Sequence, residues 1–249
     1  MRIILKSSSE LQKMRNSGLL VHRLLQELSV MVVPGVSTLD LEIAAERKIA
    51  AAGAKPAFKN YRGFPAVLCT SVNHEIIHGI PSAKRLLKEG DILKIDTGVI
   101  LDGYFGDSAT TIAVGKIAPD VQALMDVTKE SLWVGIKNAK DGGHLYDICG
   151  SIQDYVESRG YSVVKEFVGH GVGRKLHEDP SVPNYRSGPN PKLREGMVLA
   201  IEPMVNQGKA DTKVLADKWT AVAVDGKCSA HFEHTVAITK EGPWVLTQP

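Results

Sequence analysis

The 249-residue sequence has little of three features that would each point to a particular class of protein. Its three cysteines, Cys69, Cys149 and Cys228, are widely spaced and form no CxxC pair, so they fit a reducing cytoplasm rather than a disulfide scaffold. No apolar run approaches the roughly 18 residues of a membrane helix, and the N-terminus lacks the apolar stretch of a signal peptide. A net charge of +2 argues against a dedicated nucleic-acid-binding protein.

What is present is typical of a soluble globular protein, with 43% hydrophobic and 23% charged residues. Four stretches combine helical periodicity with capping residues and helix breakers at their ends. We therefore expect helices from Ser7 to the Pro34-Gly35 turn, from Thr38 to Gly53, from Pro119 to residues 141–143, and from about 145 to Gly160.

Strand-like segments fill much of the remaining sequence. Residues 162–168 and the part from Gly196 onward are rich in β-branched residues, and residues 219–239 predict a hairpin around Asp225-Gly226. Residues 179–194 contain four prolines and predict a surface loop.

The stretch Leu93–Val114 carries a strong hairpin signal, an Asp102-Gly103 pair between two β-rich runs. A turn centred on this pair sets a residue near 109 opposite Asp96 and makes Asp107 a diagonal neighbour of Asp96. Both carboxylates can then share one face of the ladder, where they repel each other unless a cation or a shared proton lies between them. On this hairpin alone, the alternative that both carboxylates face water stays open.

A short segment occurs twice in the chain. Leu87–Asp96 reads LKEGDILKID, and Leu193–Glu202 reads LREGMVLAIE. Each copy ends in a carboxylate, follows a His-x-x-Pro motif and precedes a predicted hairpin with a further carboxylate. Chance similarity at a common strand-entry turn is the alternative. Because the flanking residues repeat too, we expect two similar α/β halves, roughly 1–118 and 119–249, in one catalytic domain of residues 1–249.

Two facing halves would deliver acids from strand ends to a shared centre. Oxygen ligands with one imidazole suit Mn, Fe or Co better than a thiolate zinc site does. Two cations are needed to neutralise four acids, and a pair roughly 3.5–4 Å apart would match the pattern of two-metal hydrolases. The candidate ligands are Asp96, Asp107, Glu202 and Glu233, with His170 in a glycine-rich strand end as a fifth.

The segment His74–His78 matches the zinc-protease pattern HExxH, which requires both histidines on one face of a helix. Ile76 and Ile77 are β-branched, and Gly79 and Pro81 follow at once, so a helix is not expected. In a strand the two histidines also share a face, which leaves a role open for one of them.

Six motifs extend over nearly the whole chain: HGIP at 78–81, IDTG at 95–98, DGYFGDSATT at 102–111, GHGVGRKLHEDP at 169–180, IEPM at 201–204 and FEHT at 232–235. They resemble those of the type I methionine aminopeptidases, short members of the pita-bread metallopeptidases. The resemblance implies an α+β pita-bread fold, with two pseudo-two-fold related α/β halves around a central curved antiparallel sheet and helices on the outer face. The repeat is what that symmetry would leave in a sequence.

The resemblance implies a role for each motif residue. Asp107 and Glu233 would bridge two ions that Asp96, His170 and Glu202 also bind. The catalytic residues would be His78, His177 and Glu202, with the two histidines also contacting substrate. The methionine pocket would be lined by Tyr61, Phe64, Cys69, Leu176, Trp219 and Phe232.

Two positions depart from the family pattern. Leu176 stands where an aromatic residue is common, which would loosen the pocket rim, and His74 stands where an acid is common, which changes the local charge. An apolar slot with a sulfur atom and aromatic rims still suits a flexible thioether side chain. We expect structural roles for the remaining histidines: His22, His144, His231 and His234.

The activity that the resemblance implies is removal of N-terminal methionine from nascent proteins and peptides when the second residue is small. A hydroxide bridging two divalent ions (Co, Mn, Fe(II) or Zn) would attack the peptide bond. We expect a cytoplasmic monomer that acts near the ribosomal exit tunnel and binds no membrane. The alternatives are a prolidase or Xaa-Pro aminopeptidase of the same fold, a metal-free pita-bread binding protein, or a Cys69 nucleophile.

Overall fold

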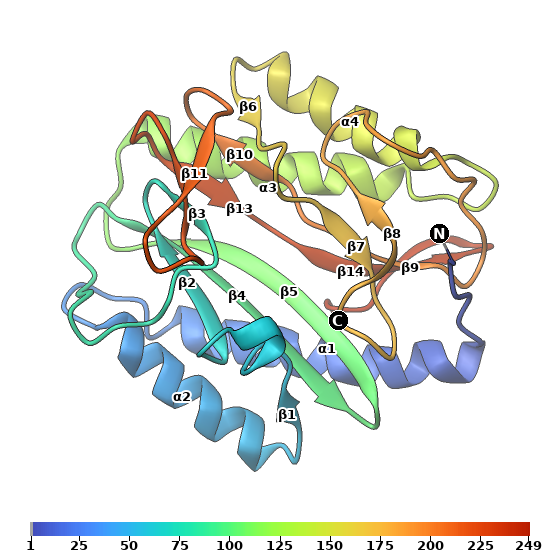
Figure 1. Cartoon of the computed structure of the whole chain (residues 1–249), viewed down its shortest axis with the longest axis horizontal. Helices are drawn as coiled ribbons and strands as arrows, with labels where there is room; N and C mark the ends of the chain where they lie inside the picture. The colour runs from blue at the N-terminus through green and yellow to red at the C-terminus, as the bar shows by residue number, and fades with distance from the viewer. Residues whose placement is uncertain (1) are drawn as a thin grey trace.

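The computed structural model describes residues 2–249, which form four α-helices and a layer of antiparallel strands (Figure 1). The helices are α1 (Ser8–Ser29), α2 (Thr38–Ala51), α3 (Pro119–Lys137) and α4 (Leu145–Glu157), with a 3-10 turn, η1 (Tyr61–Gly63). The strands are β1 (Lys55–Pro56), β2 (Leu68–Val72), β3 (Glu75–Ile77), β4 (Ile92–Leu101), β5 (Tyr104–Ala113), β6 (Ser162–Val163), β7 (Gly169–Gly171), β8 (Glu178–Val182), β9 (Val198–Ile201), β10 (Met204–Asn206), β11 (Thr212–Val214), β12 (Ala221–Ala223), β13 (Ser229–His231), β14 (His234–Thr239) and β15 (Gly242–Val245). Among residues 2–249, no helix is both long and apolar enough to cross a membrane.

The four predicted helices are present, and their ends follow local capping chemistry. Ser7 caps α1 in a capping box with Glu10, as the spacing predicts. The cap of α2 is Ser37 rather than Thr38, because the Ser37 side chain accepts from the backbone N–H of Asp40 while the Asp40 carboxylate accepts from that of Ser37. Helix α1 ends at Ser29, several residues before the Pro34-Gly35 turn.

The strands form four hydrogen-bonded sheets, and every pair of named strands is antiparallel. The predicted hairpin is β4–β5, and its register sets Asp96 opposite Ala109 and Gly98 opposite Asp107. Asp107 is therefore the diagonal neighbour of Asp96, as expected. The sheet orders are β1-β4-β2 with β5 on β4, then β13-β10-β6, β11-β12-β3 and β15-β14-β9-β7-β8.

Three strand predictions were wrong. Glu178–Val182 is not a surface loop but β8, which pairs with β7 at the edge of the five-stranded sheet. The Asp225-Gly226 turn exists, but it joins β12, which pairs with β11 and β3, to β13, which pairs with β10. Of residues 162–168, only Ser162 and Val163 lie in β6 before β7 begins at Gly169. Alternation of residue types indicates a strand but not its partner, and pairing across the sheets decides these cases.

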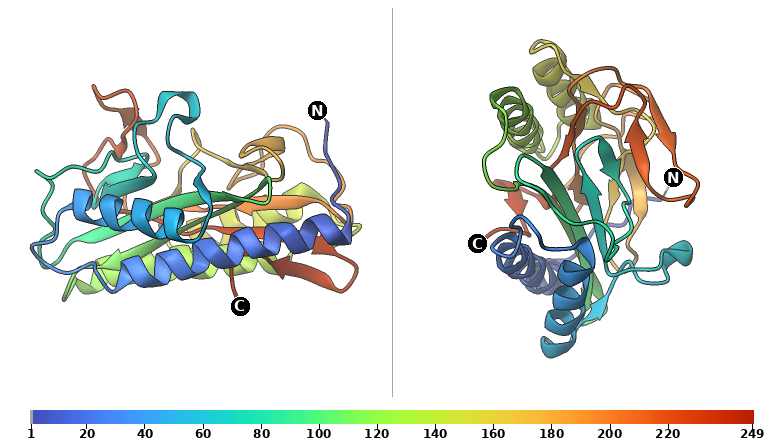
Figure 2. Two further views of the ribbon diagram at one scale, coloured as in Figure 1. Left: turned by 90° about the horizontal axis from the view of Figure 1, so that it is seen from below. Right: turned by 90° about the vertical axis from the view of Figure 1, so that its left-hand side faces the viewer.

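The helices cover one face of the strand layer, and β3, β11, β12 and the η1 loop lie on the opposite face (Figure 2). One buried cluster joins α1 and α2 to β2 and β4, and another joins α3 and α4 to β9, β10, β13 and β14. This arrangement matches the predicted α+β class. The internal duplication stays a prediction.

The two helix pairs meet along β5, which lies beside the segment 231–235. Backbone and side-chain hydroxyl groups exchange hydrogen bonds across this contact, which we call the seam. Because the seam involves strand residues on both sides, it fixes β5 against the second half of the chain. Its hydrogen bonds are Thr111 Oγ1 to the carbonyl of His231 (2.6 Å), the N–H of His231 to Thr111 Oγ1 (2.9 Å), Ser108 Oγ to the carbonyl of Glu233 (2.6 Å), the N–H of Glu233 to the carbonyl of Ala109 (3.0 Å), and Thr235 Oγ1 to the carbonyl of Asp107 (2.7 Å).

Helix α1 packs directly on β5 through Gly106. A Cβ atom at Gly106 would lie 2.6 Å from the carbonyl carbon of Ser17 and 2.7 Å from the backbone nitrogen of Gly18. Any side chain at 106 would therefore push α1 away from the hairpin that carries Asp96 and Asp107.

We predict that Gly106→Ala lowers the free energy of unfolding by roughly 1–3 kcal/mol, since backbone atoms of α1 must move. Gly135→Ala in α3 is the matched control: its Cβ would contact Ile152 Cδ1 at 2.7 Å, the end of a flexible side chain that can turn aside. Alanine also favours a helix by up to about 1 kcal/mol over glycine, so the control should change little. Urea unfolding of both variants is the measurement, and equal destabilisation would contradict this packing account.

Candidate metal centre and its cavity

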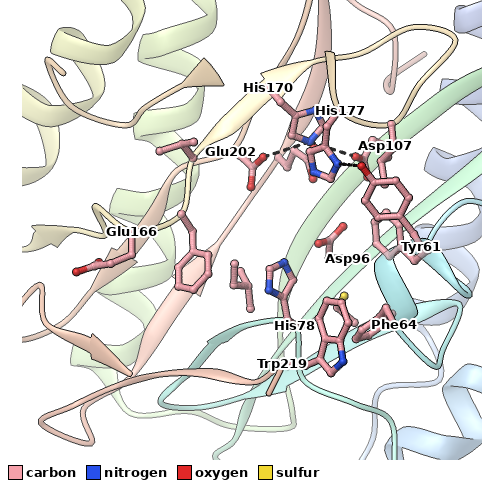
Figure 3. A pocket seen from close by; sticks show the side chains of 17 residues that line it. Tyr61, Phe64, His78, Asp96, Asp107, Glu166, His170, His177, Glu202 and Trp219 are labelled. Atoms are coloured by element: carbon pink, nitrogen blue, oxygen red, sulfur yellow. Dashed lines mark hydrogen bonds and ion pairs between the residues drawn. The ribbon is translucent and has the colours of Figure 1, made fainter. Parts of the chain in front are cut away.

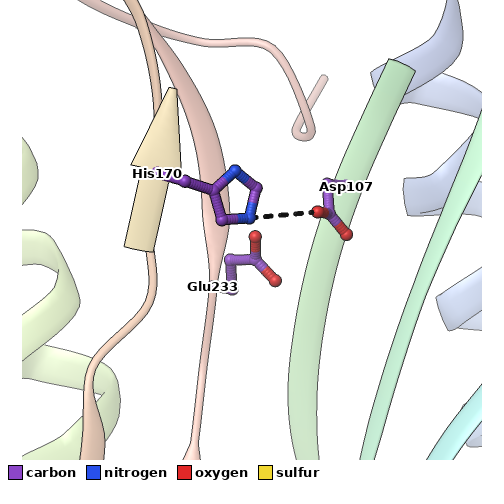
Figure 4. Close-up of side chains that lie close together, drawn as sticks. All are labelled: Asp107, His170 and Glu233. Atoms are coloured by element: carbon purple, nitrogen blue, oxygen red, sulfur yellow. Dashed lines mark ion pairs between the residues drawn. The ribbon is translucent and has the colours of Figure 1, made fainter. Parts of the chain in front are cut away.

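Five side chains from both halves of the chain, in strands or directly beside them, converge on one point (Figures 3 and 4). The hairpin supplies two of them and the five-stranded sheet supplies the others. Ile201 pairs with His234 in the ladder of β9 and β14, which brings the next residues, Glu202 and Glu233, to adjacent positions. The five are Asp96 in β4, Asp107 in β5, His170 in β7, Glu202 directly after β9 and Glu233 between β13 and β14.

His170 lies at the middle of this group. Its Nε2 is 3.7 Å from Asp107 Oδ2 and 3.7 Å from Glu202 Oε1. Its Nδ1 is 2.9 Å from the carbonyl oxygen of Gly171, to which Nδ1–H donates. This bond fixes the tautomer in which the lone pair of Nε2 faces the acids, as in metal-binding histidines. Donor atoms of Asp107, His170 and Glu233 all lie within 4.8 Å of one another.

Oxygens of these carboxyl groups lack hydrogen-bond partners among the described residues, and the groups repel one another when ionised. A divalent cation between them would remove both problems. Within residues 2–249, Asp96 Oδ1, Asp107 Oδ1 and Glu233 Oε1 are buried without a hydrogen-bond partner. Burial raises the pKa of Asp96 to about 7 and that of Glu202 to about 8. Burial, followed by repulsion from neighbouring carboxylates, raises the pKa of Asp107 and Glu233 well above the usual range. A cation would supply the missing partner for each orphaned oxygen.

The histidines around the acids are held neutral. Burial, with a smaller contribution from nearby His177, lowers the pKa of His170 to about 3. Burial also lowers the pKa of His78 and of His177 to about 4. Neutral imidazoles can accept a metal ion at one nitrogen or donate a single hydrogen bond to a substrate.

A cavity of about 230 Å³ opens beside the acids, and its far wall is apolar. Phe64 and Trp219 meet edge to face with ring centroids 5.1 Å apart. Burial, followed by the charges of Asp96 and Asp107, raises the pKa of the Cys69 thiol, which keeps it protonated and argues against a Cys69 nucleophile. The predicted pocket residues that line the cavity are Tyr61, Phe64, Cys69, Leu176 and Trp219.

Two histidines lie at the boundary between the acids and the apolar wall (Figure 3). The His177 ring lies against that of His170, with centroids 4.0 Å apart and planes tilted by 57°, and its Nδ1 is hydrogen-bonded to the Tyr61 hydroxyl at 2.7 Å. His78 meets Phe167 and Trp219 edge to face at 5.6 and 6.3 Å. Both histidines line the cavity, as predicted.

The pocket prediction was wrong for Phe232. This side chain is buried in the core cluster around α3 and lines a separate hollow between α1 and α3. Phe232 and Glu233 are neighbours near strand ends, so their side chains point to opposite faces, and only Glu233 faces the cavity. The motif match could not separate them, because it covers both.

The HExxH segment behaves as the sequence indicates. Residues Glu75–Ile77 form strand β3, and the Glu75 carboxylate accepts from the backbone N–H of Val72 and pairs with Arg85. Glu75 is thus committed to a structural contact outside the cavity, while His78 lines it.

Several cavity residues escaped the sequence analysis. Ile77 directly precedes the HGIP motif, residues 166–168 directly precede the glycine-rich segment with His170, and Phe58 lies three residues before the predicted pocket residue Tyr61. Closeness to a motif or to a predicted pocket residue was the available signal for these. His231, expected to be structural, is buried with Nε2 3.6 Å from Glu202 Oε2. Its position two residues before Glu233 was the only hint.

Comparison with known proteins agrees with this geometry. The model of Metallopeptidase family M24 matches residues 12–240. The chain belongs to metallopeptidase family M24. It is 53% identical over 248 residues to methionine aminopeptidase 1 of Bacillus subtilis, covering 99% of each. The crystal structure of methionine aminopeptidase from Thermotoga maritima superposes with a TM-score of 0.97 at 44% identity and covers 100% of both chains.

The M24 membership confirms the resemblance drawn from the motifs. A prolidase from Pyrococcus furiosus also matches, with a TM-score of 0.81 at 23% identity, covering 99% of this chain and 66% of that one. That likeness concerns the fold alone, and it agrees with the predicted pita-bread architecture. As a family of metallopeptidases, M24 also implies that this chain uses a divalent metal.

The raised carboxyl pKa values predict how metal stabilisation depends on pH. In the metal-free protein, Asp96 and Glu202 retain protons up to about pH 7 and 8, whereas the same groups in the unfolded chain lose theirs near 3.8 and 4.5. Their contribution to stability is therefore lost as pH rises through 7 and 8. A bound ion replaces these protons, so the gain in Tm with saturating Mn(II) should be larger at pH 8 than at pH 6.

For one displaced proton, the gain should grow by about 1.4 kcal/mol, or roughly 3–6 °C, per pH unit. Differential scanning calorimetry with and without Mn(II) measures the gain. Taking the difference cancels the opposite trends of groups away from the acids, such as the buried Lys94, whose pKa burial lowers to about 7. Asp107→Asn is the control, in which Mn(II) should raise Tm little at either pH. A gain in the unaltered protein that is independent of pH would contradict the proton displacement.

Proposed function

We propose that the protein is a methionine aminopeptidase that removes N-terminal methionine when the second residue is small. The observation that supports this most directly is one cavity with two different walls. Five side chains of metal-binding types line one wall, and the other is an apolar slot of aromatic, aliphatic and sulfur-containing groups. A slot of this kind suits the flexible thioether of methionine.

The proposed ligands of two divalent ions are Asp96, Asp107, His170, Glu202 and Glu233, with Asp107 and Glu233 bridging. The orphaned carboxylate oxygens and the Nε2 lone pair of His170 support this assignment. The ion could be Co, Mn, Fe(II) or Zn, since this donor set accepts several divalent metals. When bound, the ions would supply a water that is acidic enough to ionise near neutral pH and an anchor for the free amine of the substrate.

Glu202 is the proposed general base. Its carboxylate would accept the proton of the attacking water and pass it to the leaving amine. Burial raises the pKa of Glu202 to about 8 in the metal-free protein, and bound cations would lower this pKa and favour the ionised carboxylate that a general base requires. Its position directly after β9 is set by the ladder of β9 with β7 and β14.

His177 is the proposed donor to the scissile carbonyl oxygen. His177 Nδ1 and the Tyr61 hydroxyl are 2.7 Å apart, and we assign the hydroxyl as the donor, which places the proton of the neutral ring on Nε2. Nε2–H can then donate to the oxygen as negative charge develops there. His78, between Phe167 and Trp219, would hold the amide on the leaving side.

An anchor for the substrate's free amine next to the apolar slot would explain why the enzyme removes only the first residue of a chain. The free amine must reach the acids while the first side chain fills the slot, so an internal peptide bond cannot be aligned. Leu176, buried at 3% exposure among Ala57, Phe58 and Phe64, keeps the slot apolar although it supplies no aromatic ring. Nascent chains in the cytoplasm, emerging near the ribosomal exit tunnel, are the proposed substrates of a monomeric enzyme.

We predict that His177→Ala lowers kcat by roughly 100-fold or more, since one donor to a developing oxyanion is removed, while metal content is unchanged. Tyr61→Phe should lower kcat less, because only the orientation of His177 is affected. His74→Ala, outside the cavity lining, is the control and should leave both quantities unchanged. Steady-state kinetics with metal analysis by inductively coupled plasma spectrometry provides the measurement. Loss of metal from His177→Ala would refute the role given to this residue.

The substrate class is tested with two peptides of equal length. With Mn(II) or Co(II) present, Met-Ala-Ser should be hydrolysed at least 100-fold faster by kcat/KM than Ala-Pro-Ala, because the apolar slot takes the methionine side chain. Release of free amino acid, followed by chromatography, is the measurement. Preference for Ala-Pro-Ala would favour a prolidase-type activity. No hydrolysis of either peptide, with both metals bound, would favour a binding protein.

A further inference from the structure

His231 is a buried histidine whose ring has no visible partner. It ends β13 and is 1% exposed, and neither ring nitrogen is hydrogen-bonded to any other described residue. Polar atoms buried this fully are nearly always paired in folded proteins. Two free nitrogens on one ring therefore indicate a function that the hydrogen bonds within the chain do not account for.

The backbone of His231 is held rigidly in place. Its N–H donates to Thr111 Oγ1 and its carbonyl accepts from the same hydroxyl, which ties it to β5 across the seam. On the other side, His231 pairs with Met204 of β10, two residues beyond Glu202. Strands β5 and β10 thus hold the backbone of His231 from both sides and fix where its imidazole begins.

The ring faces the acid that lies nearest to it. His231 Nε2 is 3.6 Å from Glu202 Oε2, while Glu202 Oε1 is 3.7 Å from His170 Nε2. The two oxygens of one carboxylate therefore face two different imidazoles. Of these two imidazoles, that of His170 lines the cavity and that of His231 does not.

We propose that His231 is a positioning residue for Glu202: its Nε2–H donates to Oε2 and holds the carboxylate so that Oε1 faces the metal centre. This inference rests on the proposed function only for its effect on catalysis, since its effect on metal binding is independent of substrate. A small closure of the 3.6 Å separation is enough to form the bond. Such outer contacts orient ligands and typically change metal affinity or activity by about 10–100-fold.

Two amide variants separate the nitrogens of the ring. The side-chain nitrogen of glutamine reaches about as far as Nε2, whereas that of asparagine reaches about as far as Nδ1. His231→Gln should bind Mn(II) within about threefold of the unaltered protein, and His231→Asn should bind it about 10–100-fold more weakly. Isothermal titration calorimetry on metal-free protein measures both affinity and stoichiometry. In His231→Asn, kcat should fall with little change in KM, because no substrate contact is removed.

His234→Asn is the matched control. His234 is a nearby histidine whose Nδ1 is 2.9 Å from the Thr247 hydroxyl and whose ring packs on Trp133, on the helix side of the sheet. Its substitution should lower Tm without weakening Mn(II) binding. Circular dichroism establishes that each variant is folded, and if His231→Asn does not fold, the His231→Gln affinity still decides.

Three results would overturn the proposal. The first is equal Mn(II) affinity in His231→Asn and the unaltered protein. The second is loss of affinity in His231→Gln as great as in His231→Asn. The third is a change in the number of imidazoles bound to Co(II) in His231→Gln, read from its visible and electron spin echo spectra, which would make His231 a ligand. If Met-Ala-Ser is not cleaved by the unaltered protein, the proposed function fails, but the calorimetric comparison remains decisive for His231.

Discussion

Repulsion among four buried carboxyl groups is the constraint on which the rest of this structure depends. Asp96, Asp107, Glu202 and Glu233 cannot all ionise in a low-dielectric site unless positive charge lies between them. Burial is the largest cause that raises the pKa of Asp96 to about 7, and it raises that of Glu202 to about 8. The fold must therefore keep four mutually repelling side chains close together. It does so with hydrogen bonds to the backbone of the acids rather than with opposite charges.

The seam supplies most of that restraint. Thr235 Oγ1 donates to the carbonyl of Asp107, and Ser108 Oγ donates to the carbonyl of Glu233. Each proposed bridging acid is thus locked, through its own carbonyl, by a hydroxyl from the opposite half of the chain. These bonds do not depend on the charge of the carboxylates, so the site keeps its shape whether protons or ions occupy it. The contact between the two halves of the chain therefore determines the positions of Asp107 and Glu233 in the metal centre.

The parts of this site that the sequence predicted are those set by local register. An Asp-Gly turn determines which residue lies opposite Asp96, and the observed partner is Ala109. The repeated segment indicated Glu202, because it shares a strand entry with Asp96. Phe232 was misassigned although it lies beside Glu233, since which of two neighbours faces the cavity depends on the seam and not on the motif.

Contacts between distant segments were harder to predict. Nothing in the residues around His231 indicates that Glu202 lies against it, because the two come together only through the ladder of β10 with β13. The same holds for β8, which overlaps the proline-rich stretch 179–194 that suggests a loop until the pairing of β8 with β7 is known. Alternation and capping describe a segment, whereas function at this centre arises from which segments meet. A site assembled at a seam is thus the part of a fold that local patterns predict least well.

The two walls of the cavity have a common physical origin. Burial favours the neutral form of every ionisable group, so it raises the pKa of the acids and lowers the pKa of His78, His170 and His177 together. Bound metal ions would reverse this effect for the acids, whose coordination requires the ionised form, and would leave His78 and His177 as the proposed neutral donors. An apolar slot next to the centre strengthens both consequences, because it keeps water away from the charges that form there. The slot that would select the substrate side chain thereby also sets the protonation states that the reaction requires.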